Sequence, residues 1–220
     1  ERPLALRAGG ELPHVSLAWA SYGDPSRPAS ETILLFHALT GSHICAGVDP
    51  VGPSGPAQDL WTTDVSHGWW DDFVFARSAR PHGPAPAIDL DRYRVLCVTY
   101  LGSCYGSTGP LEIDPQTDAP WAERFPWVEV ADVVDGCERL LDELGLSEPL
   151  AGVIGGSVGG FCAADFAVRY PSRVRRVAPL ASAWCASNWT KALNLEQAVA
   201  IESDPDFRGG AYAAHGVDTD

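Results

Sequence analysis

Methionine is absent from the sequence, basic residues are scarce, and no long apolar run occurs. No apolar stretch approaches the roughly 20 residues that a helix needs to cross a bilayer. The first residues also lack the basic segment and apolar core of a secretory signal. We therefore expect a soluble protein without a membrane partner. Because methionine is missing and the chain runs from Glu1 to Asp220, we also expect a piece of a longer protein.

Acidic residues outnumber basic ones, with 29 Asp and Glu against 15 Lys and Arg and a formal net charge of −14. Nucleic acids and anionic membranes bind proteins through clustered Lys and Arg, so this charge excludes both as partners. Hydrophobic residues make up 45% of the chain and charged residues 20%. That balance can bury a core and excludes a disordered or collagen-like chain. We expect a single domain over residues 1–220.

The cysteines stand far apart, with no Cys-x-x-Cys pair and no Cys/His cluster at zinc-binding spacing. Neither a secreted disulfide framework nor a metal site is therefore expected. We predict reduced, mostly buried thiols and a cytoplasmic location. The six residues are Cys45, Cys97, Cys104, Cys137, Cys162 and Cys185.

Short apolar runs alternate with amphipathic segments along the chain. Continuous apolar runs predict buried parallel strands, and apolar residues at intervals of three and four predict helices. An α/β fold follows, with a mostly parallel sheet and helices on both faces. The predicted strands are 32–36, 94–99, 150–154 and 174–180, and the predicted helices are 130–144, 158–170 and 189–202, the last less firmly attached to the core.

Two other segments are less regular. Residues 4–7 and 15–19 alternate loosely, which predicts two antiparallel strands at a sheet edge, joined around Gly9 and Gly10. Residues 46–68 hold four Gly and three Pro and almost no periodicity. This segment is either an insertion that shapes a pocket entrance or a surface loop.

The motif GGSVGG at 155–160 fits the pattern G-x-S-x-G between a predicted strand and a predicted helix. A serine in this setting sits on a tight turn, and glycines at 155 and 159 let the neighbouring backbones approach closely. The turn would present Ser157 as a nucleophile, and the Val158 N–H would supply half of an oxyanion hole. The alternatives are a glycine-rich packing turn and, less favoured because no Lys follows, a phosphate-binding loop.

The sequence HALTG at 37–41 directly follows the predicted strand 32–36. In hydrolase-like sheets this loop supplies the second oxyanion donor, and we assign that role to the Leu39 N–H. For His37 we favour a role in bracing the loop by hydrogen bonds over one as a general base.

Several motifs occur together and in one order. They are HALTGS (37–42), GWWD (68–71), DRY (91–93), LGSCYGSTGP (101–110), GGSVGG (155–160) and DPDFRGG (204–210). This set resembles the homoserine O-acetyltransferase family over roughly residues 14–212. The resemblance implies an α/β-hydrolase fold.

The resemblance further implies transfer of an acetyl group from acetyl-CoA to the hydroxyl of L-homoserine, through an acyl-serine intermediate, in methionine biosynthesis. Ser157 matches the nucleophile, Leu39 and Val158 match the oxyanion amides, and residues 102–109 match a loop beside the pocket. Acetyl-CoA would be a co-substrate, no other cofactor is implied, and the family is commonly dimeric. Departures from the family pattern are Val158 in place of Met, the pair Phe161 and Cys162, and a longer segment at 46–66.

The fold places the catalytic acid and then the histidine after the nucleophile. Downstream of Ser157 the chain offers one recognisable strand and a single histidine, His215, which we interpret as a loop residue. Asp204 and Asp206 lie in a matched block that carries no triad member in the family. We therefore expect residues 1–220 to be a partial catalytic domain, inactive alone, with the triad acid and base, further strands and the lid beyond Asp220.

Other functions fit the same residues. A relative that uses succinyl-CoA, or serine as acceptor, would share every motif. A plain esterase would share the Ser157 turn and the fold. A binding protein of the same fold would need neither that turn nor the oxyanion loop.

Overall fold

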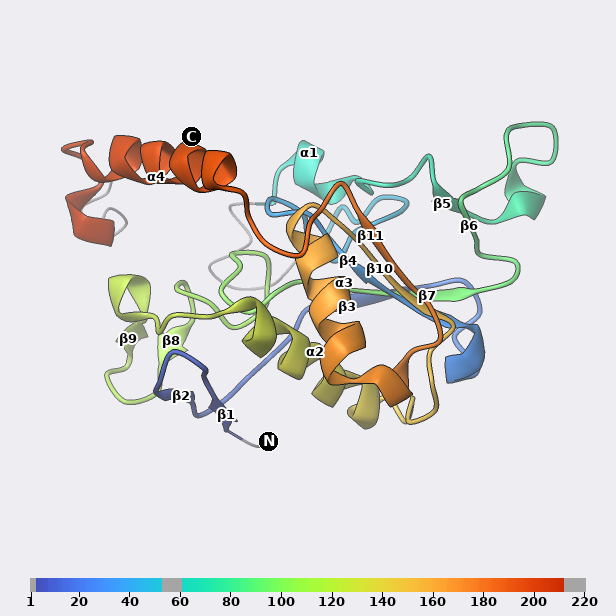
Figure 1. Cartoon of the computed structure of the whole chain (residues 1–220), viewed down its shortest axis with the longest axis horizontal. Coiled ribbons are helices and arrows are strands. Elements are labelled where there is room, and N and C mark those ends of the chain that lie inside the picture. Colours follow the sequence, from blue (N-terminus) through green and yellow to red (C-terminus); the bar gives the residue numbers. More distant parts are fainter. Residues whose placement is uncertain (1–2, 53–60, 212–220) are drawn as a thin grey trace.

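A five-stranded sheet forms the centre of the computed structural model, which describes residues 3–52 and 61–211 (Figure 1). All neighbouring strands pair in parallel except β3, which runs antiparallel to β7 at one edge. The predicted mostly parallel sheet is thus confirmed. In spatial order the strands are β11 (Val177–Leu180), β10 (Gly152–Gly156), β4 (Thr32–Phe36), β7 (Arg94–Val98) and β3 (Trp19–Tyr22).

Two helices cover one face of the sheet, α2 (Val130–Glu143) and α3 (Val158–Arg169), and both were predicted. Their buried side chains, such as Val134 and Phe166, pack on Leu34 and its neighbours in one apolar cluster. Side chains alternate along a strand, so every second residue of the central strands joins this cluster. The helices thereby anchor the strand ends from which the candidate site is built.

The opposite face is covered differently from the prediction. Within the described residues, Ile33 and Leu35 pack there on Cys45, Val74 and Ile88, which come from the irregular chain between β4 and β7. In the described part of the chain this connection, and not a second layer of helices, covers that face. That connection is rich in Gly and Pro, which favour turns over a continuous helix.

The N-terminal hairpin is shorter than predicted. Strand β1 (Leu4–Ala5) pairs with β2 (Glu11–Leu12) as a separate two-stranded sheet, around glycines with positive φ. The predicted strand at 15–19 is wrong, because side chains of another loop take its amides. Ser16 N–H donates to Thr108 Oγ1 at 2.8 Å, and Ala18 N–H donates to Ser107 Oγ.

Helix α4 (Asn188–Glu202) confirms the last predicted helix and its loose attachment, since none of its residues is buried. Figure 1 shows it set apart from the sheet. The smaller elements are α1 (Thr63–Ser66), β5 (Val74–Phe75), β6 (Ile88–Asp89), β8 (Ile113–Asp114), β9 (Ala119–Pro120) and the 3₁₀ turns Ala29–Glu31, Arg77–Ala79, Ala122–Arg124, Pro171–Arg173 and Arg208–Gly210.

The irregular segment predicted at 46–68 includes α1 and a bridge between Val48 and His67, and its residues 53–60 lie outside the described part. Four of the six cysteines are buried and all are unpaired, in agreement with the prediction. None of the described helices has both the length and the apolar character needed to cross a membrane. The described residues also contain no His, Cys, Asp and Glu grouping suited to a metal ion.

Candidate active site

Ser157 occupies the turn between strand β10 and helix α3. Its backbone has φ of 55° and ψ of −119°, a positive-φ conformation that is rare for a residue with a side chain. Such a conformation costs about 1–3 kcal/mol and persists only where the surrounding structure enforces it. The residue is exposed, so the turn presents its hydroxyl to solvent. This is the geometry that the glycine-rich motif predicts.

Two glycines make the turn possible because other backbones touch their Cα atoms. A Cβ on residue 155 would lie 2.0 Å from the carbonyl oxygen of Gly159. A Cβ on Gly159 would lie 2.4 Å from the carbonyl oxygen of Phe36 and 2.5 Å from that of His37. Only glycine fits at either position, which confirms the close approach predicted from the motif.

The two predicted oxyanion amides lie at the same edge of the sheet as Ser157. In the ladder between β10 and β4, Gly155 is paired with Phe36, so Ser157 and the turn that contains Leu39 both follow this register point. Leu39 is 79% exposed, and Val158 is the first residue of α3. Within the described residues, neither main-chain N–H donates to a backbone carbonyl. Both donors are thus available to a ligand.

His37 lies buried at the end of β4, with Nδ1 2.6 Å from the carbonyl oxygen of Ala38. This bond confirms the predicted bracing role. Burial lowers the pKa of His37 to about 4, since desolvation of the imidazolium outweighs the favourable contact with the Ala38 carbonyl. The ring is therefore neutral at physiological pH. Burial also lowers the pKa of His43, whose Nδ1 lies 2.8 Å from Thr99 Oγ1.

The low pKa of His37 predicts acid-sensitive stability. The unfolded chain binds the proton with an ordinary pKa of 6.5, so lowering the pH from about 6.5 to 4 favours the unfolded state. A shift of this size corresponds to about 3 kcal/mol, all present above pH 6.5 and lost by pH 4. The check is urea unfolding across that window for wild type and His37→Asn. Parallel stability profiles for the two proteins would contradict the assignment.

An aromatic side chain that sequence reasoning missed also borders the turn. A Cβ on Gly156 would lie 3.4 Å from Cζ2 of Trp70, so the indole packs beside the residue that precedes Ser157. The Trp69 and Trp70 rings lie 4.9 Å apart, and Trp70 also contacts Phe73. The motif GWWD was the available signal, but nothing in its spacing indicates this tertiary contact.

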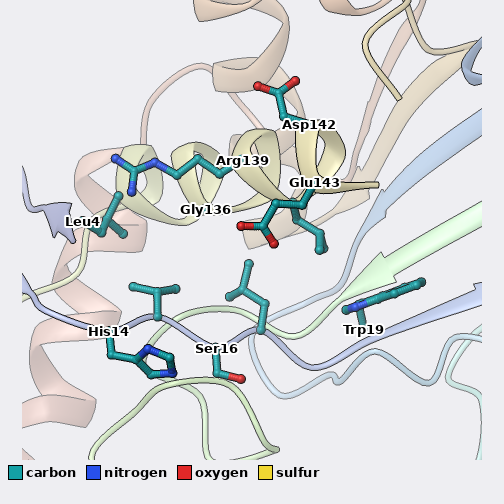
Figure 2. Close-up of a pocket in the computed structure, with 11 residues that line it drawn as sticks. Leu4, His14, Ser16, Trp19, Gly136, Arg139, Asp142 and Glu143 are labelled. Atoms are coloured by element: carbon teal, nitrogen blue, oxygen red, sulfur yellow. The ribbon is translucent and has the colours of Figure 1, made fainter. Parts of the chain in front are cut away.

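The cavity drawn in Figure 2 lies elsewhere. It has a volume of about 800 Å³ and is lined by the N-terminal segment and one side of α2, including His14, Trp19, Arg139 and Glu143. None of the predicted site residues lines it. The cavity is therefore separate from the turn that carries Ser157.

In the described part of the chain, no candidate acid or base contacts the Ser157 side chain. Within 3–52 and 61–211, no hydrogen bond joins the Ser157 hydroxyl to a histidine or a carboxylate. Asp204 and Asp206 are exposed near the end of α4, where Asp204 accepts from the N–H of Asp206. His215 lies outside the described residues. The predicted location of the acid and base beyond Asp220 stays a prediction.

Comparison with known proteins supports the predicted fold and the predicted family resemblance. The family described as alpha/beta hydrolase fold matches residues 31–220. Homoserine O-succinyltransferase from Methylibium petroleiphilum is 43% identical over 215 residues, which are 98% of this chain and 50% of that protein. A homoserine O-acetyltransferase from Thermus thermophilus is 39% identical over 209 residues, which are 95% of this chain and 52% of that protein.

Among solved structures, that of esterase E22 superimposes with a TM-score of 0.77 and 31% identity, over 96% of this chain and 54% of the esterase. The chain spans about half the length of the curated relatives it matches. The predicted resemblance to the homoserine O-acetyltransferase family is confirmed along nearly the whole chain, with relatives named both O-succinyltransferase and O-acetyltransferase. The chain belongs to the α/β-hydrolase fold family.

Proposed function

We propose that the protein to which this chain belongs is a homoserine O-acyltransferase, with acetyl-CoA as donor and Ser157 as nucleophile. The observation that carries the proposal is the exposed Ser157, held at positive φ at the same sheet edge as Leu39 and Val158, whose main-chain N–H groups have no backbone acceptor in the described residues. The relatives that match nearly the whole chain are named homoserine O-succinyltransferase and homoserine O-acetyltransferase.

In the first half-reaction, Ser157 Oγ attacks the thioester carbonyl carbon and loses its proton to a general base. The carbonyl oxygen becomes an oxyanion, which the N–H groups of Leu39 and Val158 stabilise. Collapse of this intermediate breaks the carbon–sulfur bond, releases the CoA thiol and leaves an acyl ester on Ser157. In the second half, the homoserine hydroxyl attacks that ester and regenerates the serine. The histidine and carboxylate that move the protons would lie outside the described residues.

The described residues that border the Ser157 turn favour an acetyl over a succinyl donor. Val158 follows Ser157, Trp70 packs beside Gly156, and both side chains are uncharged. A succinyl group would bring a second carboxylate into the site, and a partly desolvated carboxylate needs a cationic or hydrogen-bonding partner. An acetyl group needs none.

Steady-state assays on the full-length protein test the function. Acetyl-CoA or succinyl-CoA is combined with L-homoserine, L-serine or no acceptor, and thiol release and product are measured. We expect kcat/KM to be highest for acetyl-CoA with homoserine, by about tenfold or more over either alternative, since each tenfold needs only about 1.4 kcal/mol of discrimination. A higher kcat/KM with succinyl-CoA would contradict the proposed donor, and a higher kcat/KM with serine would contradict the proposed acceptor.

The similarity to esterase E22 favours ester hydrolysis as the second candidate function. Both reactions use an acyl-serine intermediate, and they differ in whether water or homoserine removes the acyl group. Continued thiol release without homoserine, well beyond one equivalent per enzyme, would support the esterase, because acylation alone releases only the first equivalent.

The remaining proposals follow from the relatives' names. A protein that acylates homoserine would act in methionine biosynthesis, and we place it in the cytoplasm, where acyl-CoA donors are available. A homodimer is proposed from the family resemblance alone.

A further inference from the structure

The carbonyl oxygen of Ala38 accepts two hydrogen bonds. His37 Nδ1 lies 2.6 Å from it, and the main-chain N–H of Gly41 donates to it at 3.0 Å. A carbonyl oxygen can only accept, so the proton of the neutral His37 ring is on Nδ1. The oxygen is therefore fixed from two directions.

Fixing this oxygen also fixes the N–H of Leu39. The two groups belong to one peptide unit, and the described chain has no cis peptide bonds. In a trans peptide the C=O and N–H point in opposite directions in one rigid plane. The bond from His37 therefore sets where the Leu39 N–H points, and that N–H is among those without a backbone acceptor in the described residues.

The His37 ring is itself held rigidly. It stacks on Tyr100 with ring centroids 3.7 Å apart and planes inclined by 16°, and the Tyr100 hydroxyl donates to the His37 carbonyl. At position 41 a Cβ would lie 2.8 Å from the His37 Cβ, so glycine allows the ring to lie against the turn. An imidazole ring held in place by these contacts can orient the neighbouring peptide group between Ala38 and Leu39.

Packing alone does not account for a histidine at this position. His37 is 1% exposed, and its Nε2 is buried with no hydrogen-bond partner in the described part of the chain. A buried polar atom without a partner destabilises the folded state. An apolar ring would fill the space without that cost, but it could not donate to Ala38.

The turn that contains Ala38 and Leu39 follows residues that pack against the turn that carries Ser157. Gly159, in the first turn of α3, packs on the carbonyl oxygens of Phe36 and His37. The geometry points to His37 as a positioning residue, which aims the Leu39 N–H at the oxyanion formed beside Ser157. This role rests on the proposed function.

Two isosteric variants separate orientation from general packing. In His37→Asn, the side-chain amide places a donor close to the position of Nδ1, whereas in His37→Gln it reaches the position of Nε2. Acylation of the full-length protein by acetyl-CoA and by p-nitrophenyl acetate is followed in single turnovers, with kcat and KM separated and folding checked by urea unfolding.

We expect His37→Asn to be acylated at a rate within about threefold of wild type. We expect His37→Gln to lose about tenfold or more in kcat while KM stays unchanged, because an oxyanion donor that points in the wrong direction weakens only the binding of the transition state. Tyr100→Phe, which keeps the stacked ring, is the second test if His37→Gln fails to fold. It should lower kcat and leave KM unchanged.

Equal rates for the Asn and Gln variants, or an effect on KM alone, would overturn the role of His37 while leaving the proposed function intact. The two failures are distinguishable, because an unreactive wild-type protein would remove the proposed function and the positioning role together.

Discussion

Ser157→Ala is expected to lower acyl transfer by the full-length protein at least about 10⁴-fold, since removal of a nucleophile eliminates the covalent route and leaves only binding and oxyanion stabilisation. The stability should not fall, because Ser157 is exposed and its side chain does not cap α3. Alanine at this positive-φ position retains the same backbone strain. The measurement is kcat/KM with acetyl-CoA and homoserine.

Ser182→Ala is the matched control for this loss. The Ser182 side chain lies against Gly160, and its buried hydroxyl has no hydrogen-bond partner within the described residues. Removing an unsatisfied hydroxyl is close to neutral for stability. An equal loss of activity in both variants would show that the site responds to any change near α3. It would contradict the assignment of Ser157 as the nucleophile.

Gly159→Ala is the substitution with the largest expected effect on stability. The new Cβ would lie within 2.5 Å of the carbonyl oxygens of Phe36 and His37, which belong to the backbone and cannot rotate away. Strand β4 and helix α3 would have to separate. We expect a loss of about 3–5 kcal/mol, at the upper end for overpacked sites. The urea midpoint of unfolding measures it.

The same substitution in helix α2 has the opposite expected sign. A Cβ on Gly136 would make ordinary contacts of 3.5 and 3.6 Å with Leu101 and Leu17. Alanine is favoured over glycine in a helix by about 1 kcal/mol. Gly136→Ala should therefore stabilise the protein slightly. If Gly159→Ala also left the stability unchanged, this would contradict the tight packing of the turn that carries Ser157.

The central elements could be predicted because their sequence patterns are local. The strand at 32–36 is a continuous apolar run, and all five of its residues are buried. The helix at 130–144 was marked by apolar residues at helical intervals, and the structure begins it at Val130 and ends it at Glu143. The nucleophile turn was recognisable because its glycines meet a steric requirement that no other residue satisfies.

The missed features depend on contacts between distant segments. The run at 15–19 has the alternation of a strand, but hydroxyls of Ser107 and Thr108 accept the hydrogen bonds of its amides. Trp70 reaches Gly156 across more than 80 positions of sequence. The buried Nε2 of His37 likewise results from stacking on Tyr100, which the motif HALTG does not indicate.

Trapping of the covalent intermediate tests the account most directly. The full-length protein is mixed with acetyl-CoA in the absence of homoserine, quenched in acid, digested and mapped by mass spectrometry. We predict one added acetyl group on the peptide that contains Ser157, lost on addition of homoserine and absent from Ser157→Ala. An adduct on another residue, one that persists in Ser157→Ala, or thiol release with no acylated serine at any time would contradict it.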